Sequence, residues 1–327
     1  CIGTTETAVD VADPWLQQDQ GRGLYVAMPT QATSNQMFDR FLEFLGHRYP
    51  NEAVNAHLVH GQAAWLDKLQ EIELQTIGDD KSEGIAAMTW FKPRKRTLLA
   101  PFGVGTVDQT LLSILQTRHF FVRLFGLSHK IVIFDEVHAY DTYMNTLFHR
   151  LLEWLHAIGT SVIILSATLP ADTRRALVKA YAGQELDETE PAYPALTIAS
   201  ADQKPQHIKL EAPADYTVQI VWSVGREPEA IAAFLKQALV DGGCTAVLCN
   251  TVRRAQDIYR ALQKADLAIP QDDLILFHAR FPPIWRQAIE KKVLKKFGKP
   301  DENGRSPHRP HRAIVVATQV IEQSLDL

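Results

Sequence analysis

Residues 131–138, IVIFDEVH, decide the fold of this chain, because four apolar residues run directly into two acids. A short β-branched and aromatic run that ends in a polar cluster is typical of a buried strand in a parallel sheet. In open α/β sheets the functional groups collect just beyond the carboxyl ends of the strands. The stretch therefore predicts a central strand with Asp135 and Glu136 at its functional end.

Five further apolar runs have the same character, and each ends in polar residues. They are residues 24–28, 162–165, 246–249, 274–277 and 313–317. Amphipathic stretches of helical length lie between them, at residues 35–44, 142–157, 172–182, 227–239, 253–264 and 284–297. Because strands and helices alternate along the chain, we expect the α/β class with parallel sheets.

The chain is long enough for two domains. It has 327 residues, of which 46% are hydrophobic and 22% charged, and this is ordinary globular usage. Residues 185–214 are rich in Pro, Ala, Asp and Glu and lack a long periodic element, as a connection between domains does. We therefore expect a first domain over residues 1–206 and a second over residues 207–327.

The composition argues against several classes of protein. A net charge of −4 does not suit a protein that coats DNA non-specifically, so any nucleic-acid contact must be local. The three cysteines have no CxxC spacing, so we expect neither disulfides nor structural zinc. The apolar runs are far shorter than the roughly 20 residues of a membrane helix, and no signal peptide is visible. We expect a soluble, cytoplasmic protein with no membrane contact.

Two acids side by side at a strand end are suited to nucleotide hydrolysis. In a P-loop ATPase the first acid, here Asp135, holds Mg²⁺, usually through water. The second, here Glu136, polarises the water that attacks the terminal phosphate. The same two acids could instead belong to a helix N-terminus, where negative charge is also favourable. The acidic pair alone does not decide between these functions.

A second polar cluster follows the next predicted strand. Residues 166–170 read SATLP, and by itself such a segment is only a turn. A DExH tetrapeptide and a later SAT tripeptide, each at a strand end and in this order, resemble the signature of superfamily 2 helicases. In that superfamily the hydroxyl motif couples the nucleotide site to movement of the strand. The resemblance makes His138 a catalytic candidate and Ser166, Ala167 and Thr168 the coupling candidates.

The first residues resemble the end of a phosphate-binding loop. Residues 3–8, GTTETA, match the tail of the helicase pattern Gly-Lys-Thr-Glu-x-Ala, but the first half of that loop is missing. The backbone N–H groups of such a loop hold the phosphates and its lysine neutralises their charge. Here Thr4 replaces the lysine. The nucleotide candidates are Gly3, Thr4, Thr5 and Glu6, with ATP as the cofactor and Mg²⁺ bound by Thr5 and Asp135.

Polar residues at the remaining strand ends are candidates for nucleic-acid contact. Hydroxyls, amides and free helix N-termini suit a DNA phosphate, although the same residues also make good helix caps. Each segment alone would pass as a loop, whereas the ordered set would not. The candidates are Pro29, Thr30, Gln31, Thr106, Asp108, Asn250, Thr251, Arg280, Thr318, Gln319 and Gln323.

Taken in order, the motifs resemble the CRISPR-associated type I helicase-nuclease over nearly the whole chain. The segments are PTQAT (29–33), GTVDQ (105–109), DEVHAYD (135–141), SATLP (166–170), NTV (250–252), HARF (278–281) and ATQVIEQSLD (317–326). The resemblance implies two RecA-like domains in tandem, both incomplete at the chain ends. It also implies an ATP-driven motor on single-stranded DNA, recruited by an RNA-guided CRISPR surveillance complex, that unwinds and helps degrade invader DNA. Guide pairing would supply the sequence specificity, while the motor grips the backbone.

The sequence departs from this family in three places. It lacks half of the phosphate loop, the arginine-bearing motif that follows Asp326 in relatives, and the nuclease domain, which we expect in the same or a partner chain. Because an arginine finger is worth roughly 10³ to 10⁵ in rate, we expect the chain alone to hydrolyse ATP poorly or not at all. Two other functions stay open: a degenerate module that binds DNA or a partner without turnover, and a general superfamily 2 DNA or RNA helicase.

Overall fold

The chain forms two compact units. The structure is a computed structural model and describes residues 4–18, 20–50, 54–59, 85–86, 97–117, 119–140, 142–187, 193–211, 219–220, 222, 225–265, 267–298 and 308–321. Unit 1 is Cys1–Asp215 and unit 2 is Tyr216–Leu327. The boundary at residues 206 and 207 stays a prediction, and a strand of unit 1, β8 (Gln206–Lys209), begins there.

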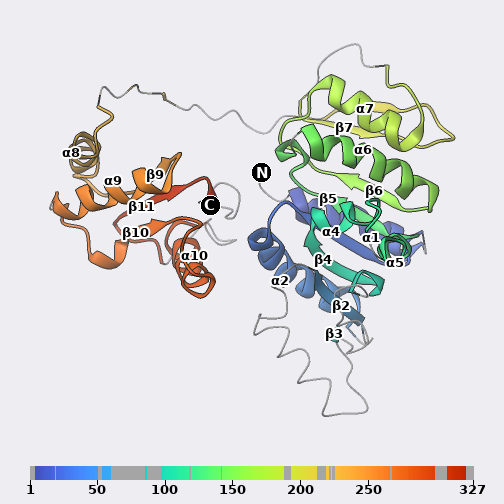
Figure 1. The fold of residues 1–327 in the computed structure, drawn as a ribbon, viewed down its shortest axis with the longest axis horizontal. Coiled ribbons are helices and arrows are strands. Elements are labelled where there is room, and N and C mark those ends of the chain that lie inside the picture. The colour runs from blue at the N-terminus through green and yellow to red at the C-terminus, as the bar shows by residue number, and fades with distance from the viewer. Residues whose placement is uncertain are drawn as a thin grey trace. The chain divides into compact units, whose positions relative to one another are not determined.

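Unit 1 is built on a parallel sheet that has six strands in the described residues. Their order is β3-β2-β4-β1-β5-β6, so β1 lies between β4 and β5. Strands β2 to β6 of this sheet are labelled in Figure 1. In the register, Ala27 of β1 lies opposite Gly105 of β4 and Phe134 of β5. The strands are β1 (Leu24–Met28), β2 (Val54–Val59), β3 (Ile85–Ala86), β4 (Phe102–Thr106), β5 (Ile131–Phe134) and β6 (Ser161–Ile164).

Helices cover both faces of this sheet, and the alternation of side chains along β1 explains why. Leu24 and Val26 face a core shared with α1 (Thr4–Gln17) and α2 (Gln31–Arg48). Tyr25 and Ala27 face a second core, which includes side chains of helices on the other face. These helices are α4 (Val107–Leu111), α6 (Thr142–Ala157) and α7 (Ala171–Ala182), and α5 (Phe120–Leu127) joins them beside η3 (Thr97–Leu99). Strands buried on both faces read as continuous apolar runs, as predicted.

Gly105 allows β4 to approach its neighbours closely. A Cβ atom at this position would lie 2.3 Å from the carbonyl oxygen of Val59 in β2 and 2.4 Å from the hydroxyl oxygen of Tyr25 in β1. Both distances are far below van der Waals contact. Glycine is therefore required where β4 runs between these two strands.

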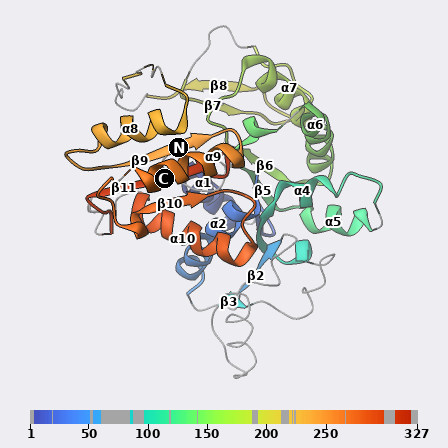
Figure 2. The same ribbon diagram turned by 60° about the vertical axis from the view of Figure 1, so that its left-hand side comes forward.

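The predicted connection between the domains contains a small sheet. Strands β7 (Ala195–Ile198) and β8 pair antiparallel, with Leu196 opposite Ile208 (Figure 2). The absence of a long periodic element in this region of the sequence hid two strands of four residues each.

Unit 2 carries a second parallel sheet, with the order β10-β11-β9 in its described residues. Its strands are β9 (Gly243–Cys249), β10 (Leu274–Phe277) and β11 (Arg312–Thr318), and all three lie where the sequence predicts strands. Side chains of α8 (Pro228–Ala238) and α9 (Val252–Lys264) pack on one face, and those of α10 (Pro283–Phe297) pack on the other. The remaining short helix is η5 (Gln271–Asp273). The α/β class with two parallel-sheet units is confirmed.

No helix within the described ranges is both long and apolar enough to cross a bilayer.

Lys130 is buried at the amino edge of the unit 1 sheet, directly before β5. Its side chain is 5% exposed, and its Nζ donates to the carbonyl oxygen of Leu98 at 2.7 Å and to that of Ala100. Burial removes the ammonium from water and lowers its pKa from 10.5 to about 7. The folded chain therefore releases this proton at a lower pH than the unfolded chain does.

This depressed pKa predicts a pH-dependent stability. Between about pH 7 and pH 10 the unfolded chain binds more protons at Lys130, so the free energy of unfolding rises with pH across this interval. This gain in stability is fully present above the pKa that Lys130 has in the unfolded chain. It is lost as the pH falls toward the pKa of about 7 that Lys130 has in the folded chain. We expect Lys130→Met to remove this rise, as measured by urea unfolding at pH 6.5, 8 and 9.5. The matched control is Lys209→Met at an exposed lysine, and a rise that persists in Lys130→Met would contradict the assignment.

Candidate functional site

Four strand ends of unit 1 meet along one edge of the sheet. Strands β4, β1, β5 and β6 are neighbours in this order, and all of them are parallel. The residues that follow each strand therefore share the carboxyl edge. From one side to the other they are Val107 and Asp108, Pro29 and Thr30, Asp135 and Glu136, and Leu165 and Ser166. These clusters therefore follow neighbouring strands along one edge of unit 1.

Asp135 is held in place by the backbone on both sides. It is 5% exposed, and its N–H donates to the carbonyl oxygen of Ala27 at 3.0 Å. Its Oδ1 accepts the N–H of Glu136 at 2.9 Å. The first bond ties the backbone of Asp135 to the end of β1, and the second ties its carboxylate to its own turn.

Glu136 adopts an unfavourable backbone conformation that turns its side chain toward His138. Its φ of 55° lies in the left-handed region, which is uncommon for residues other than glycine. Such strain collects at functional sites, where the surrounding structure maintains it. The Oε2 of Glu136 lies 3.1 Å from the Nε2 of His138, which follows in the short helix η4 (Val137–Ala139).

His138 connects the acidic pair to the SAT turn. Its Nδ1 lies 3.3 Å from the Oγ of Ser166, and that hydroxyl lies 2.8 Å from the carbonyl oxygen of Thr168. The backbone makes a second link, because the N–H of Val137 donates to the carbonyl oxygen of Leu165 at 3.2 Å. The catalytic and coupling candidates therefore form one connected group.

The hydroxyl of Ser166 has one proton to share between two partners, the ring of His138 and the carbonyl of Thr168. A serine hydroxyl has one proton, and in this geometry Ser166 donates it to the carbonyl of Thr168. A His138 ring that donates from Nδ1 to Ser166 and from Nε2 to the carboxylate of Glu136 is compatible with this bond. A ring that donates from both nitrogens is an imidazolium. If the ring is neutral and accepts at Nδ1, Ser166 donates to the ring and loses its hydrogen bond to the carbonyl of Thr168.

Helix α1 directs its N-terminus toward the same edge. Arg22, just after α1, bonds its N–H to the carbonyl oxygen of His129 at 2.7 Å, which places the end of α1 at the amino edge of the sheet. The helix has 14 residues and is about 21 Å long, against about 17 Å for β1, so it spans the sheet. Thr4, Thr5 and Glu6 open this helix, although their side chains and Gly3 lie outside the described residues.

The oxygen ligands at this edge fit Mg²⁺ in the way a nucleotide site does. Carboxylate oxygens are the ligands that Mg²⁺ prefers, and the ion usually takes one or two carboxylates together with substrate phosphates and water. Asp135 supplies one such group, while the carboxylate of Glu136 faces His138. Within the described ranges no group of three or more His, Cys, Asp or Glu side chains could hold a metal by itself. The nucleotide phosphates would have to complete the coordination.

The nucleic-acid candidates of unit 1 differ in accessibility. Thr30 is the N-cap of α2, and its hydroxyl accepts the N–H of Thr33 at 3.2 Å. Thr106 is only 5% exposed, so little of it is open to a ligand. Gln31 and Asp108 are exposed at the edge, and Pro29 is half-buried. The exposed side chains and the N–H groups at the start of α2 are the parts open to a ligand.

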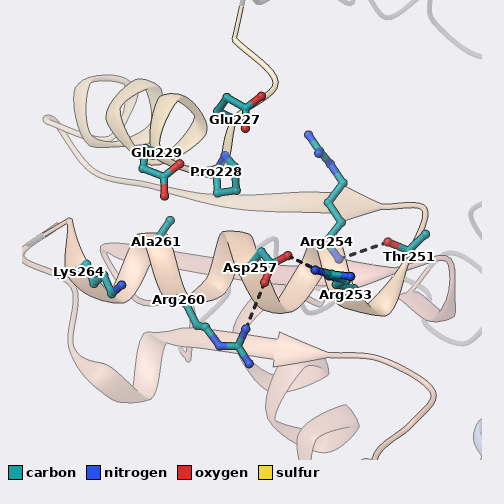
Figure 3. Close-up of a pocket in the computed structure, with 10 residues that line it drawn as sticks. All are labelled: Glu227, Pro228, Glu229, Thr251, Arg253, Arg254, Asp257, Arg260, Ala261 and Lys264. Atoms are coloured by element: carbon teal, nitrogen blue, oxygen red, sulfur yellow. Dashed lines mark hydrogen bonds and ion pairs between the residues drawn. The ribbon is translucent and has the colours of Figure 1, made fainter.

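Unit 2 has a pocket that extends along α9, from its N-cap to its last residue, and that the start of α8 also lines (Figure 3). Its volume is about 630 Å³, and it includes the predicted residue Thr251, whose hydroxyl accepts the N–H of Arg254 at 3.2 Å. Four basic side chains line it, together with three acidic ones; these are Arg253, Arg254, Arg260 and Lys264, with Glu227, Glu229 and Asp257.

The basic side chains of this pocket are not among the site residues predicted from the sequence. Arg253, Asp257, Arg260 and Lys264 recur at intervals of three and four residues, which places them on one face of α9. This spacing was the signal that could have found them. Asp257 pairs with Arg260 at 3.1 Å and lies 4.0 Å from Arg253, so it neutralises part of the positive charge.

The other candidates of unit 2 lie at the carboxyl ends of its strands. Asn250, Arg280 and Gln319 are exposed, whereas Thr318 is 6% exposed. Gln323 lies outside the described residues. Within the HARF segment, the ring of His278 stacks on that of Phe281, with centroids 4.3 Å apart and an interplanar angle of 11°, and this contact shapes the turn that presents Arg280.

Comparisons with known proteins agree on one family. Residues 241–327 match the family model described as CRISPR-associated nuclease/helicase Cas3, C-terminal. The CRISPR-associated endonuclease/helicase Cas3 of Thermus thermophilus is 38% identical over 369 aligned positions, which cover 100% of this chain and 39% of the relative. The chain thus spans well under half of the length of that relative.

Two solved structures resemble the fold. The crystal structure of T. fusca Cas3-ATP matches with a TM-score of 0.74 and 34% identity, over 93% of this chain and 36% of the other. A chain of a CRISPR RNA-guided surveillance complex in a pre-nicking state matches with a TM-score of 0.60 and 28% identity, over 100% of this chain and 40% of the other. In sequence and in fold, this chain belongs to the CRISPR-associated Cas3 family of type I helicases.

Proposed function

We propose that this chain is the ATP-dependent motor segment of a CRISPR type I interference effector. It moves along single-stranded DNA, unwinds invader DNA and helps degrade it. The observation that carries the proposal is the connected path Glu136–His138–Ser166. This path joins an acidic pair suited to phosphate chemistry to the SAT turn, which is suited to transmitting the state of the nucleotide site. The match to a Cas3 structure solved with ATP supports nucleotide binding by the family.

The residues at the carboxyl edge of unit 1 have distinct chemical roles in this proposal. Asp135 would hold Mg²⁺, and Thr5 would add a ligand to the same ion. When bound, Mg²⁺ neutralises charge on the transferring phosphate. The carboxylate of Glu136 orients the attacking water and accepts its proton, with His138 holding the carboxylate from the other side. Gly3, Thr4 and Glu6 contact the phosphates.

The path through His138 provides coupling. When a proton or a water binds to the carboxylate of Glu136, the hydrogen bond between this carboxylate and the ring of His138 changes. The ring then changes its bond to Ser166, and Ser166 either keeps or releases the carbonyl of Thr168. Ala167 lies between these two residues and moves with them. Coupling through hydrogen bonds of this kind requires only small displacements.

Contact with DNA is local in this proposal. The exposed groups at the edge of unit 1 and the basic pocket of unit 2 contact phosphates of a single strand, and guide pairing in a surveillance complex supplies the sequence specificity. Asn250, Thr251, Arg280 and Gln319 belong to the same set. We also propose an RNA-guided surveillance complex as the partner, a nuclease domain in the same or a partner chain, and a cytoplasmic location.

The test is ATP hydrolysis by the complete protein, with single-stranded DNA and with RNA of the same sequence. The proposal expects hydrolysis that DNA stimulates and RNA does not, because the 2′-OH distinguishes the two strands. Equal stimulation by both would instead indicate a general superfamily 2 helicase.

Thr4 favours a second candidate function, a module that binds DNA or a partner without turnover. The lysine of a phosphate loop neutralises phosphate charge, and a threonine cannot do so. On this basis we propose that the chain alone hydrolyses ATP slowly. Calorimetric titration of the complete protein with ATP separates the two candidates, because the second expects no binding.

Ser166→Ala is expected to separate hydrolysis from movement. The alanine cannot bridge His138 and the carbonyl of Thr168, while the acidic pair keeps its own contacts. In the complete protein we expect ATP hydrolysis within about threefold of wild type and strand displacement lowered at least about tenfold, or roughly 1.4 kcal/mol. The matched control is Ser161→Ala, at the opposite end of β6. Equal losses in both assays would argue against a coupling role.

A further inference from the structure

Tyr140 has a buried hydroxyl that the structure does not satisfy. The residue is 7% exposed. It follows the short helix η4, which itself comes directly after the acidic pair. Its phenolic oxygen is inaccessible to solvent and has no hydrogen-bond partner among the described residues. Buried polar groups in folded proteins are nearly always bonded, and the exceptions call for an explanation, such as a catalytic role or an ion that completes the bonding.

The ring of Tyr140 is fixed by two aromatic contacts in series. It meets Phe148 of α6 edge to face, with centroids 5.3 Å apart, and Phe148 meets Phe134 of β5 in the same way at 4.8 Å. The carboxamide of Asn145 donates to the carbonyl oxygen of Tyr140 at 3.2 Å. The phenol is therefore attached to the strand that ends in Asp135 and cannot swing toward solvent without breaking these contacts.

The charges of two carboxylates act on this phenol. Burial is the main cause that raises the pKa of Tyr140, and the charges of Asp135 and Asp108 raise it further. The hydroxyl thus keeps its proton at any physiological pH and is available as a donor. Tyr25 makes a useful contrast, since its hydroxyl is within 3.5 Å of the carbonyl oxygen of Thr106.

Asp135 can accept such a donor while it performs another task. A carboxylate offers about four lone-pair directions, and the N–H of Glu136 uses one of them at Oδ1. Residues that orient a metal-binding carboxylate from behind typically change metal affinity by about 10 to 100-fold when they are lost.

We propose that Tyr140 is a positioning residue of the magnesium site, whose hydroxyl donates to the Asp135 carboxylate when a magnesium nucleotide engages it. This inference rests on the proposed function, because it assigns Asp135 to Mg²⁺. The ring contacts place the donor, the buried hydroxyl has a bond still to make, and Asp135 is the metal-binding group of its own turn. The phenol limits how the carboxylate rotates and so lowers the cost of binding the ion.

Tyr140→Phe in the complete protein tests this role, because it removes one oxygen and keeps the ring. We expect Mn²⁺, titrated in the presence of ADP and followed by electron paramagnetic resonance, to bind about tenfold more weakly than in wild type. ADP affinity measured in EDTA should stay unchanged, and the thermal midpoint should not fall, because the variant loses only an unsatisfied group. Tyr143→Phe, at a tyrosine of α6 that is 69% exposed, is the matched control and should behave as wild type.

Three results would overturn the inference. Wild-type Mn²⁺ affinity in Tyr140→Phe would overturn it alone and leave the proposed function intact. A weaker affinity accompanied by a lowered thermal midpoint would assign the hydroxyl a role in folding instead. A wild-type protein that binds no Mn²⁺ with ADP would overturn this inference and the proposed function together.

Discussion

Glu136→Gln in the complete protein is expected to lower ATP hydrolysis by roughly 10² to 10⁴-fold while nucleotide binding is retained. The amide has nearly the shape of the carboxylate, so the strained turn and the position of Asp135 should survive. It cannot accept a proton from the attacking water, however, and it carries no charge to pair with His138. The loss should therefore fall on kcat rather than on KM.

The measurement is steady-state ATP hydrolysis with saturating single-stranded DNA, together with ATP binding by calorimetry. Glu153→Gln is the matched control, because Glu153 lies on the exposed side of α6 and pairs only with Arg150 in the described residues. A Glu136→Gln protein that retains more than about a tenth of the wild-type rate would exclude Glu136 as the general base.

Phe148→Ala is expected to destabilise unit 1 by about 3 to 5 kcal/mol, which is a large part of the stability of an ordinary domain. The side chain is fully buried in the core between the sheet and α6. It touches the ring of Phe134 on one side and that of Tyr140 on the other, so its removal leaves a cavity between the central strand and the turn that follows it.

Urea unfolding monitored by far-ultraviolet circular dichroism checks this value. Trp154→Ala, on the same helix but 41% exposed, is the control and should cost much less. A loss below about 1 kcal/mol in Phe148→Ala would mean that the core can collapse around the missing ring. It would also weaken the assignment of a fixed position to Tyr140.

The central elements could be predicted because their sequences are simple. Strands β1, β5 and β10 have the predicted ends, and so does helix α6. Each of these strands is a short apolar run bounded by polar residues, and α6 has a clear amphipathic period. Strand β6 begins one residue earlier than predicted, at Ser161, since the ladder with β5 pairs Ser161 with Ile131 regardless of its polarity.

The elements that were missed have weak patterns for physical reasons. Strand β4 reads FGVGT, and its two glycines resemble a turn although Gly105 is there to let β2 and β1 come close. Helix α1 carries Pro14 in its last turn, which resembles a break. Neither position can be understood without the neighbours that it contacts.

The candidate site was predicted in part. Strand ends gave the positions of the acids and of the SAT turn, since parallel strands place such residues at one edge. The contact between His138 and Ser166 bridges residues 28 apart in sequence, and no local pattern encodes it. The burial of Thr106 and Thr318 is likewise set by tertiary packing, so two hydroxyls predicted to face DNA are enclosed instead.

The bond from the N–H of Val137 to the carbonyl of Leu165 has an evolutionary consequence. Both partners are main-chain atoms, so exchanging either side chain leaves the tie between the two turns in place. Among the twenty amino acids only proline at position 137 lacks the hydrogen on which the tie depends. Substitutions at positions 137 and 165 can therefore change the chemistry of the nucleotide site while the main-chain bond to the SAT turn remains.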